Sequence, residues 1–224
     1  MRRLIVHVEG ETEEMFVNEI LAPYLRNYGY TNVSARLIGN ARNRSRRGGI
    51  RDWKTVKQEI LNHLRNDPNC ISTIMVDYYA LPKDWPGRGD AEKFSFPQKA
   101  EYIQNELAED IRSEMGSGFN PSRFIPNVVM HEFEGLLFSD PASFARGIGK
   151  PRIEAQLQQI RNQFSTPEEI NDSSTTAPSK RIEQIIPNYE KPILGTLAIL
   201  EIGLLKIKEE CPNFHRWILN LENS

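Results

Sequence analysis

Cysteine is almost absent from this chain of 224 residues, which contains only Cys70 and Cys211. Two isolated thiols provide neither a disulfide framework nor a zinc site, and they are typical of proteins in a reducing cytoplasm. Long apolar runs are also missing. The most apolar segment, residues 193–205, is interrupted by Glu201 and is much shorter than the ~20 residues that cross a bilayer. We therefore expect a cytoplasmic protein without a membrane span, in which residues 193–205 form a buried helix.

The chain has no strong excess of charge of either sign. Its 28 Lys and Arg residues nearly balance 30 Asp and Glu residues, which gives a formal net charge of -2. This balance excludes a surface that binds polyanions in general, so any contact with nucleic acid has to be local. A Gly-x-x-x-x-Gly-Lys loop is absent as well, which argues against ATP hydrolysis by a P-loop of its own.

Strand and helix patterns alternate along the first 140 residues. Apolar or alternating runs predict strands at residues 4–8, 32–39, 71–76 and 124–130. Apolar residues at helical spacing predict helices at residues 13–25, 52–65 and 97–115. This alternation predicts a mostly parallel sheet with helices on both faces. After Pro141 the pattern is helical. The expected fold class is therefore α/β, with a core at residues 1–140 and a helical C-terminal extension at 141–224 that packs on the core.

Three of the predicted strands end in acidic residues. Glu9 follows the first strand, Asp77 follows the third, and Glu132 and Glu134 follow the fourth. Ligands of an open parallel sheet bind beyond the carboxyl ends of its strands, so these carboxylates meet if the strands are neighbours. Clustered carboxylates repel one another, and Mg²⁺ or Mn²⁺ relieves that repulsion by binding their oxygens. The sequence predicts a metal site here, whereas a single such acid is more often a helix cap or a solvated turn residue.

The stretch "VEGETEE" contains more acid than one helix start needs. We expect Thr12 to cap the following helix and Glu13 to lean toward the metal site, while Glu11 and Glu14 face solvent. Gly10 suits a turn where a backbone or ligand approaches closely. If Glu9 and Asp77 share a cation, their carboxylates lie within about 5–6 Å of each other.

A basic stretch follows the second predicted strand. It has no acidic residue between Arg36 and Asp52, and its Gly48-Gly49 pair is typical of a loop. Such a loop can lay guanidinium groups along a phosphate backbone, or it can be a solvated loop without function. The candidate nucleic-acid-binding residues are Arg42, Arg44, Arg46, Arg47, Arg51 and, farther along the chain, Arg181.

Five motifs carry a resemblance to a known family. In order they are "VEGETE", "DYYALPKDWPG", "HEFEGLLFSDP", "PSKRI" and "YEKPILG". The strand-"VEGxTE"-helix pattern resembles the Toprim domain of topoisomerases, bacterial primases and OLD-family nucleases. The ordered set resembles a Toprim-like family of bacterial proteins of unknown function, often associated with ATPases in defence loci. This resemblance implies a Toprim/Rossmann-like sheet and a magnesium-dependent hydrolase: a DNA-binding or RNA-binding nuclease of phage defence.

The resemblance also assigns roles to single residues. It makes Glu9 the Toprim glutamate and Asp77 the first acid of an Asp-x-Asp pair, but Tyr79 replaces the second acid. Another carboxylate would have to supply the missing ligand. The implied metal ligands are Glu9, Glu13, Asp77, Glu132 and Glu134. The implied catalytic residues are Glu9, Asp77, Glu134 and Lys191, the last of which would stabilise phosphate charge together with Arg181.

Three functions remain open at this point. The first is a nuclease that uses Mg²⁺ or Mn²⁺. The second is a non-catalytic or conditionally active subunit that binds an ABC- or AAA-type ATPase, which is compatible with a homo-oligomer. The third is a phosphotransfer or nucleotidyl-transfer enzyme that uses the same metal-binding carboxylates. His131 is a proton shuttle or a structural residue, and Trp85 and Tyr79 either contact a nucleotide or hold their loop to its own domain.

Overall fold

The computed structural model describes residues 2–38, 50–171, 173 and 175–224. These residues form two compact units. Unit 1 comprises Met1–Val76, Ala80–Val128 and Leu219–Ser224, and unit 2 comprises Asp77–Tyr79 and Val129–Ile218. Four of the candidate nucleic-acid-binding residues, Arg42, Arg44, Arg46 and Arg47, lie outside the described residues.

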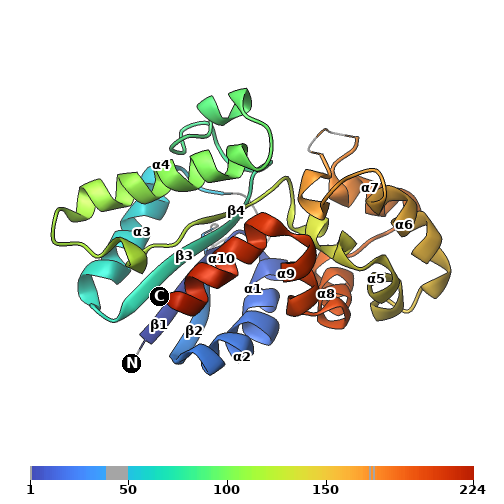
Figure 1. The fold of residues 1–224 in the computed structure, drawn as a ribbon, viewed down its shortest axis with the longest axis horizontal. Coiled ribbons are helices and arrows are strands. Elements are labelled where there is room, and N and C mark those ends of the chain that lie inside the picture. The colour runs from blue at the N-terminus through green and yellow to red at the C-terminus, as the bar shows by residue number, and fades with distance from the viewer. Residues whose placement is uncertain (1, 39–49, 172, 174) are drawn as a thin grey trace. The chain divides into compact units, whose positions relative to one another are not determined.

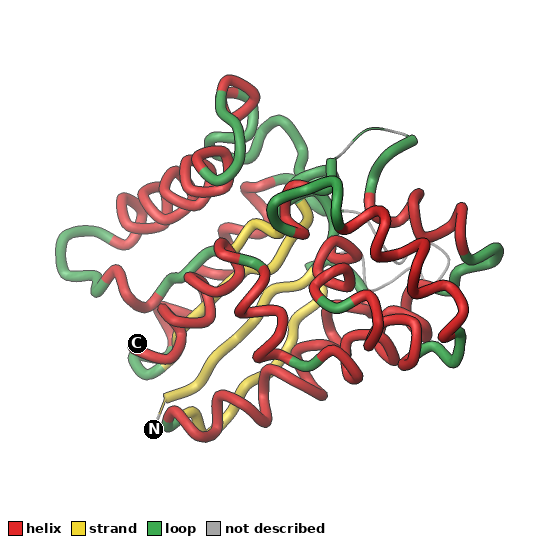
Figure 2. The backbone as a smooth tube through the Cα atoms, turned by 45° about the vertical axis from the view of Figure 1, so that its right-hand side comes forward, coloured by secondary structure: helices red, strands yellow, loops and turns green. Residues whose placement is uncertain are grey.

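The sheet has four strands in the order β2-β1-β3-β4. Strand β1 pairs in parallel with both β2 and β3, and the strands run side by side in Figure 2. The bounds are β1 Arg2–Val8, β2 Tyr30–Leu37, β3 Cys70–Asp77 and β4 Asn127–Val129. Only β4 is clearly shorter than predicted, because Pro126 cannot donate a hydrogen bond to a neighbouring strand. The α/β fold with a parallel sheet is confirmed.

Helices cover both faces of this sheet. Helices α3 and α4 lie on one face, and α1 and α2 lie on the other (Figure 1). A π-helical turn at Val17–Leu21 joins α1 to α2, so the predicted helix at 13–25 forms as one segment. The bounds are α1 Glu11–Phe16, α2 Ala22–Leu25, α3 Trp53–Asn66 and α4 Gln98–Met115. Met15 is an exception to the predicted apolar face, because its side chain is 40% exposed.

The two faces of the sheet differ in polarity because side chains of a strand alternate between faces. On β1, Leu4, Val6 and Val8 are fully buried. The residues between them include His7, whose ring lies 5.7 Å from that of His63 on α3. The α3 face is therefore partly polar, whereas the α1 face is an apolar core.

The last residues of the chain complete unit 1. Tyr30 at the start of β2 donates a hydrogen bond from Oη to the carbonyl of Leu221, at 2.8 Å. Tyr24 on α2 donates from Oη to Oε1 of Glu222, at 2.7 Å. These bonds join segments almost 200 residues apart in the sequence and close the α1 side of the sheet.

Unit 2 is helical, as expected for the sequence after Pro141. Its α-helices are α5 Pro141–Gly147, α6 Glu154–Arg161, α7 Pro178–Ile185, α8 Thr196–Ile202 and α9 Leu204–Glu210, and α10 Pro212–Asn223 begins in this unit. Short 3-10 segments occur at Phe133–Ser139 (η6), Pro151–Ile153 (η7) and Pro167–Glu169 (η8), and a π-helical turn occurs at Lys191–Gly195 (η9). No described helix is both long and apolar enough to cross a bilayer.

The prediction of one buried helix at residues 193–205 is wrong. Gly203, with a φ of 78°, separates α8 from α9. Helix α8 packs closely on α5, where a Cβ on Gly147 would lie 2.7 Å from the carbonyl oxygen of Leu197. Only one side of α8 is covered in this way. The exposed fractions of four apolar residues are 57% for Ile193, 45% for Leu197, 47% for Leu200 and 71% for Leu205.

A buried carboxylate caps the last helix. Glu168 accepts hydrogen bonds from the backbone N–H groups of Asn213, at 2.8 Å, and Phe214, at 3.1 Å. Burial raises the pKa of Glu168 to about 7, although these bonds oppose the rise. A carboxyl whose pKa is raised on folding stabilises the fold most below its unfolded pKa, and this contribution is lost as the pH rises through 7.

We therefore expect Glu168→Gln to change the pH dependence of stability. Between about pH 4.5 and 8 the wild-type protein should lose up to roughly 3 kcal/mol of unfolding free energy that the variant does not lose. Urea unfolding at pH 5 and pH 8 measures this difference. Glu154→Gln, at an exposed position on α6, controls for the removal of one charge. Parallel pH profiles for wild type and Glu168→Gln would contradict the assignment.

Candidate functional site

Three carboxylates in unit 2 act on one ammonium group. Nζ of Lys191 lies 3.1 Å from Oε1 of Glu134. Burial alone would lower the pKa of Lys191, but the carboxylates of Glu134, Glu132 and Asp77 outweigh burial and raise it. Lys191 therefore stays charged at neutral pH. These four residues, which we call the carboxylate–lysine cluster, include three that the sequence assigned to catalysis.

Glu134 is the most buried carboxylate of the cluster, with 3% of its surface exposed. Its pKa is raised by burial and by the nearby charge of Glu132, while Lys191 opposes the rise. The residue lies in η6, in which every residue is buried. Because a buried carboxylate needs a cation to remain charged, Lys191 sets the charge state of Glu134.

Backbone hydrogen bonds hold the other two carboxylates. Oδ1 of Asp77 accepts from the N–H of Phe133, at 2.9 Å. Oε2 of Glu132 accepts from the N–H of Ser179 in the first turn of α7, also at 2.9 Å. A carboxylate is favoured at the start of a helix by the partial positive charge there. Glu132 therefore has a structural task in addition to the predicted metal binding.

The turn before Glu132 has an uncommon backbone conformation. His131 has a φ of 66°, in the left-handed region that few residues other than glycine adopt. Its carbonyl accepts from the N–H of Tyr79, at 3.1 Å, and its ring meets that of Tyr78 edge-on, with centroids 6.1 Å apart. Backbone strain of this kind is often found at functional sites. These contacts favour the structural role of His131 over the proton shuttle.

Tyr189 is a residue of this region to which sequence reasoning gave no role. Its Oη is buried and has no hydrogen-bond partner among the described residues. Burial raises the pKa of Tyr189, and the charge of Glu134 raises it further. The phenol thus stays neutral, so it can donate a hydrogen bond to an anion. Its place in the motif "YEKPILG", two residues before Lys191, was the only signal in the sequence.

In unit 1, the predicted cap of the first helix is wrong. Helix α1 begins at Glu11, Gly10 is its N-cap residue, and Thr12 lies inside the helix. Oε2 of Glu13 accepts from the backbone N–H of Gly10, at 3.0 Å. This is the glutamate half of a capping box, in which the third helical residue bonds back to the N-cap. Glu13 is buried there, and its predicted metal binding stays a prediction.

Glu9 directly follows β1, and Asp77 is the last residue of β3. Val8 pairs with Met75, so these strands are neighbours, and the order β1-β3-β4 confirms that the three strands that end in acid are adjacent. Glu9 belongs to unit 1 and Asp77 to unit 2. The distance between their carboxylates therefore stays a prediction.

The chemistry of the cluster suits a hard cation. Carboxylate oxygens such as those of Asp77 and Glu134 are preferred ligands of Mg²⁺. In this structure the positive charge beside Glu134 is the ammonium of Lys191. In the part of the chain that the structure describes, no three Asp, Glu, His or Cys side chains are already arranged around one metal position. Because Nζ of Lys191 lies 3.1 Å from Oε1 of Glu134, a cation bound at that oxygen would share it with Lys191 or displace Lys191.

Arg51 and Arg181 are the two nucleic-acid-binding candidates that the structure describes, and each interacts with a residue of its own unit. Arg51 pairs with Glu59 at 3.2 Å, and Nε of Arg181 donates to the carbonyl of Thr176 at 2.8 Å. Their binding of nucleic acid stays a prediction. Trp85 is 2% exposed and donates to the carbonyl of Arg51, at 3.0 Å, so this aromatic holds its loop to unit 1.

Comparison with known proteins places these residues in context. Residues 8–222 match the family described as "Domain of unknown function (DUF4276)". The C-terminal region of the Burkholderia pseudomallei OLD protein is 12% identical with a TM-score of 0.49, covering 100% of this chain and 98% of that one. The corresponding region of the Xanthomonas campestris pv. campestris OLD protein is 14% identical with a TM-score of 0.43, covering 100% and 95%. No curated protein matches the chain.

Proposed function

The chain belongs to the DUF4276 family, and we propose that it is a Toprim-type nuclease that hydrolyses phosphodiester bonds of DNA or RNA with Mg²⁺ or Mn²⁺. The observation that carries this proposal is the carboxylate–lysine cluster. Three carboxylates act on the half-exposed ammonium of Lys191 at the point where β3 and β4 end. The pKa values of Glu134 and Lys191 are both raised, with each other's charge among the causes, and shifted pKa values with a specific charge partner are typical of catalytic sites.

Each member of the cluster has a task in this reaction. Asp77 and Glu134 would hold the cation, with Glu132 beside them, and a bound cation would polarise the scissile phosphate and help to ionise the attacking water. Lys191 offsets the negative charge that develops on the phosphate oxygens. We further propose that Glu9 contributes a ligand or a general base, as the resemblance to Toprim domains implies.

A nuclease assay tests the proposal. The purified protein is incubated with linear, circular and single-stranded DNA and with RNA, in the presence of Mg²⁺ or Mn²⁺. We expect cleavage by the wild-type protein and none by the double variant Glu9→Ala/Asp77→Ala, while EDTA stops the reaction. Cleavage that survives in the double variant would come from a contaminant and would refute the proposal.

A second function, a subunit that binds a partner ATPase in a defence system, is favoured by one observation. Ile193, Leu197 and Leu200 are spaced by four and three residues, so they form one exposed apolar stripe on η9 and α8. Contiguous exposed apolar surface marks protein interaction sites. Copurification with an ATPase encoded beside this protein tests the idea. A protein that is inert alone but cleaves when the ATPase is added would unite the two functions, and failure to copurify would exclude the second.

A further inference from the structure

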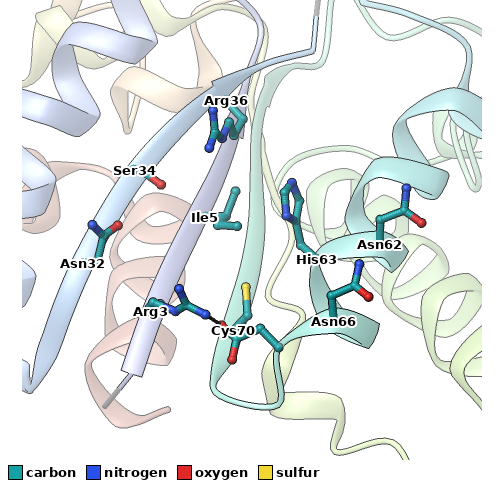
Figure 3. A pocket seen from close by; sticks show the side chains of 10 residues that line it. Arg3, Ile5, Asn32, Ser34, Arg36, Asn62, His63, Asn66 and Cys70 are labelled. Carbon is teal, nitrogen blue, oxygen red and sulfur yellow. Dashed lines mark hydrogen bonds and ion pairs between the residues drawn. The ribbon is translucent and has the colours of Figure 1, made fainter.

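A polar cavity lies in unit 1, between the sheet and α3. Its volume is about 620 Å³. Figure 3 shows side chains of β1, β2 and α3 around it, with Arg36 and Arg3 at opposite ends. The parallel register sets Arg3 beside Asn32 and Ile5 beside Ser34, so polar side chains of β2 line this face. No residue of this cavity belongs to the carboxylate–lysine cluster.

The cavity carries an excess of positive charge. Arg3 is paired with Asp67, the single carboxylate of the lining. Arg36 forms no ion pair or hydrogen bond with any described residue. The stretch that follows it, residues 39–49, contains neither Asp nor Glu in its sequence. A guanidinium with no carboxylate partner at the end of a cavity is suited to bind an anion, and phosphate fits its fork of N–H donors.

Two buried polar side chains on the same face lack a partner. His7 is fully buried, and neither of its ring nitrogens has a hydrogen bond within the described part of the chain. Oγ of Ser72, which is paired in register with Ile5, is likewise buried and unbonded. Buried polar groups are bonded in the great majority of cases. Neither residue lines the cavity, but Ser72 is the register partner of Ile5, which does, and the His7 ring lies 5.7 Å from that of His63, which also does.

Electrostatics favour an anion over a metal ion at this face. Burial and the charges of His63 and Arg36 lower the pKa of His7 to about 3, and burial and Arg36 also lower the pKa of His63. Both imidazoles are therefore neutral at physiological pH. Neutral imidazoles could bind a metal, but the guanidinium of Arg36 beside them repels a cation and attracts an anion.

We propose that this cavity binds a nucleotide, with its phosphate on Arg36 and its base against the imidazole of His63. The volume falls within the roughly 300–1,000 Å³ range of small-molecule sites, and inorganic phosphate alone would leave most of it empty. The amides of Asn62 and Asn66, which line the cavity from α3, offer donors and acceptors to a base or ribose.

Isothermal titration calorimetry in EDTA tests the proposal with three probes: ADP, inorganic phosphate and adenosine. We expect ADP to bind, and each of the other two to bind at least about tenfold more weakly, because each offers only part of the contacts. Arg36→Gln should lower the affinity for ADP by about tenfold or more, as loss of a charge-assisted hydrogen bond does. Arg65→Gln, on α3 but outside the cavity, should leave it unchanged.

Two further measurements keep the test independent of folding. Ser34→Leu fills the cavity from β2 and should abolish ADP binding without lowering the unfolding temperature. The ¹⁵N resonances of the His7 ring should shift when ADP is added. Absence of heat with ADP, or equal affinity in Arg36→Gln and wild type, would overturn the proposal. So would an oligonucleotide that binds through Arg36 when ADP does not. EDTA removes divalent cations, so these outcomes do not depend on the proposed nuclease.

Discussion

Replacement of Lys191 by methionine is expected to lower the free energy of unfolding by about 2–3 kcal/mol at neutral pH. The variant leaves Glu134 buried without a cation, next to Glu132. Breaking a buried ion pair costs about 3–5 kcal/mol, and we expect less here because the Lys191 side chain is 42% exposed and water screens the pair. Urea unfolding measures the change.

Whether the unpaired charge of Glu134 causes this loss can be tested by removing that charge as well. Lys191→Met/Glu134→Gln should recover most of the lost stability, because it removes the uncompensated carboxylate. Mg²⁺ should also stabilise Lys191→Met, by about 2.7 kcal/mol at a concentration a hundredfold above its dissociation constant. Lys180→Met removes an exposed ion pair with Glu183 and should change stability by less than about 1 kcal/mol. A loss in Lys191→Met no larger than in Lys180→Met would contradict the role of the cluster.

Asp77→Asn is expected to lower the rate of phosphodiester cleavage by roughly a thousandfold, because an amide is neutral and binds a hard cation poorly. The fold should be retained, since the asparagine Oδ1 can still accept the hydrogen bond from the N–H of Phe133. Cleavage rates at saturating Mg²⁺ and the unfolding temperature are the two measurements needed.

A matched change distinguishes this effect from a general loss of negative charge. Asp90→Asn lies in η4 (Asp90–Lys93), in the exposed loop region after β3, and should leave the rate unchanged. Rates that fall equally in both variants would show that Asp77 has no special part in the reaction. A full rate in Asp77→Asn would remove it from the site.

The parallel sheet could be predicted because each of its strands is marked locally. Apolar runs such as residues 71–76 end at a polar residue, and the helices between them show a clear apolar face. On α3, Trp53, Val56 and Ile60 are buried as this spacing indicates. The alternation did not give the order of the strands, so only the structure shows that the strands ending in Glu9, Asp77 and the Glu132 turn are neighbours.

The roles of single carboxylates could not be read in the same way. A glutamate that binds a cation and one that accepts a backbone N–H have the same letter in the sequence. Glu13 bonds to Gly10, and Glu132 bonds to the first turn of α7, which lies 47 residues farther along. Such bonds depend on where distant segments pack. The left-handed turn at His131 could not be predicted either, because no glycine marks it in the sequence.

The high apolar content of residues 193–205 was the basis of the wrong prediction of one buried helix. A high share of apolar residues does not distinguish a helix covered on all sides from one that packs on a single neighbour. Gly203 in the left-handed region breaks the segment, and α5 covers only the side of α8 that includes Ala198 and Ile199. Leu197 and Leu200 remain exposed on the other side.

The return of residues 219–224 to unit 1 has a consequence for synthesis on the ribosome. Tyr30 reaches its partner Leu221 only after the 191 residues from 31 to 221 have been translated. At 5–20 residues per second this takes about 10–40 seconds. During that time the α2–β2 side of the nascent chain lacks its final cover, while residues 129–218 of unit 2 are made in one uninterrupted stretch. Unit 1 begins to emerge first, and yet residues 219–224, which complete its core, are made only after all of unit 2.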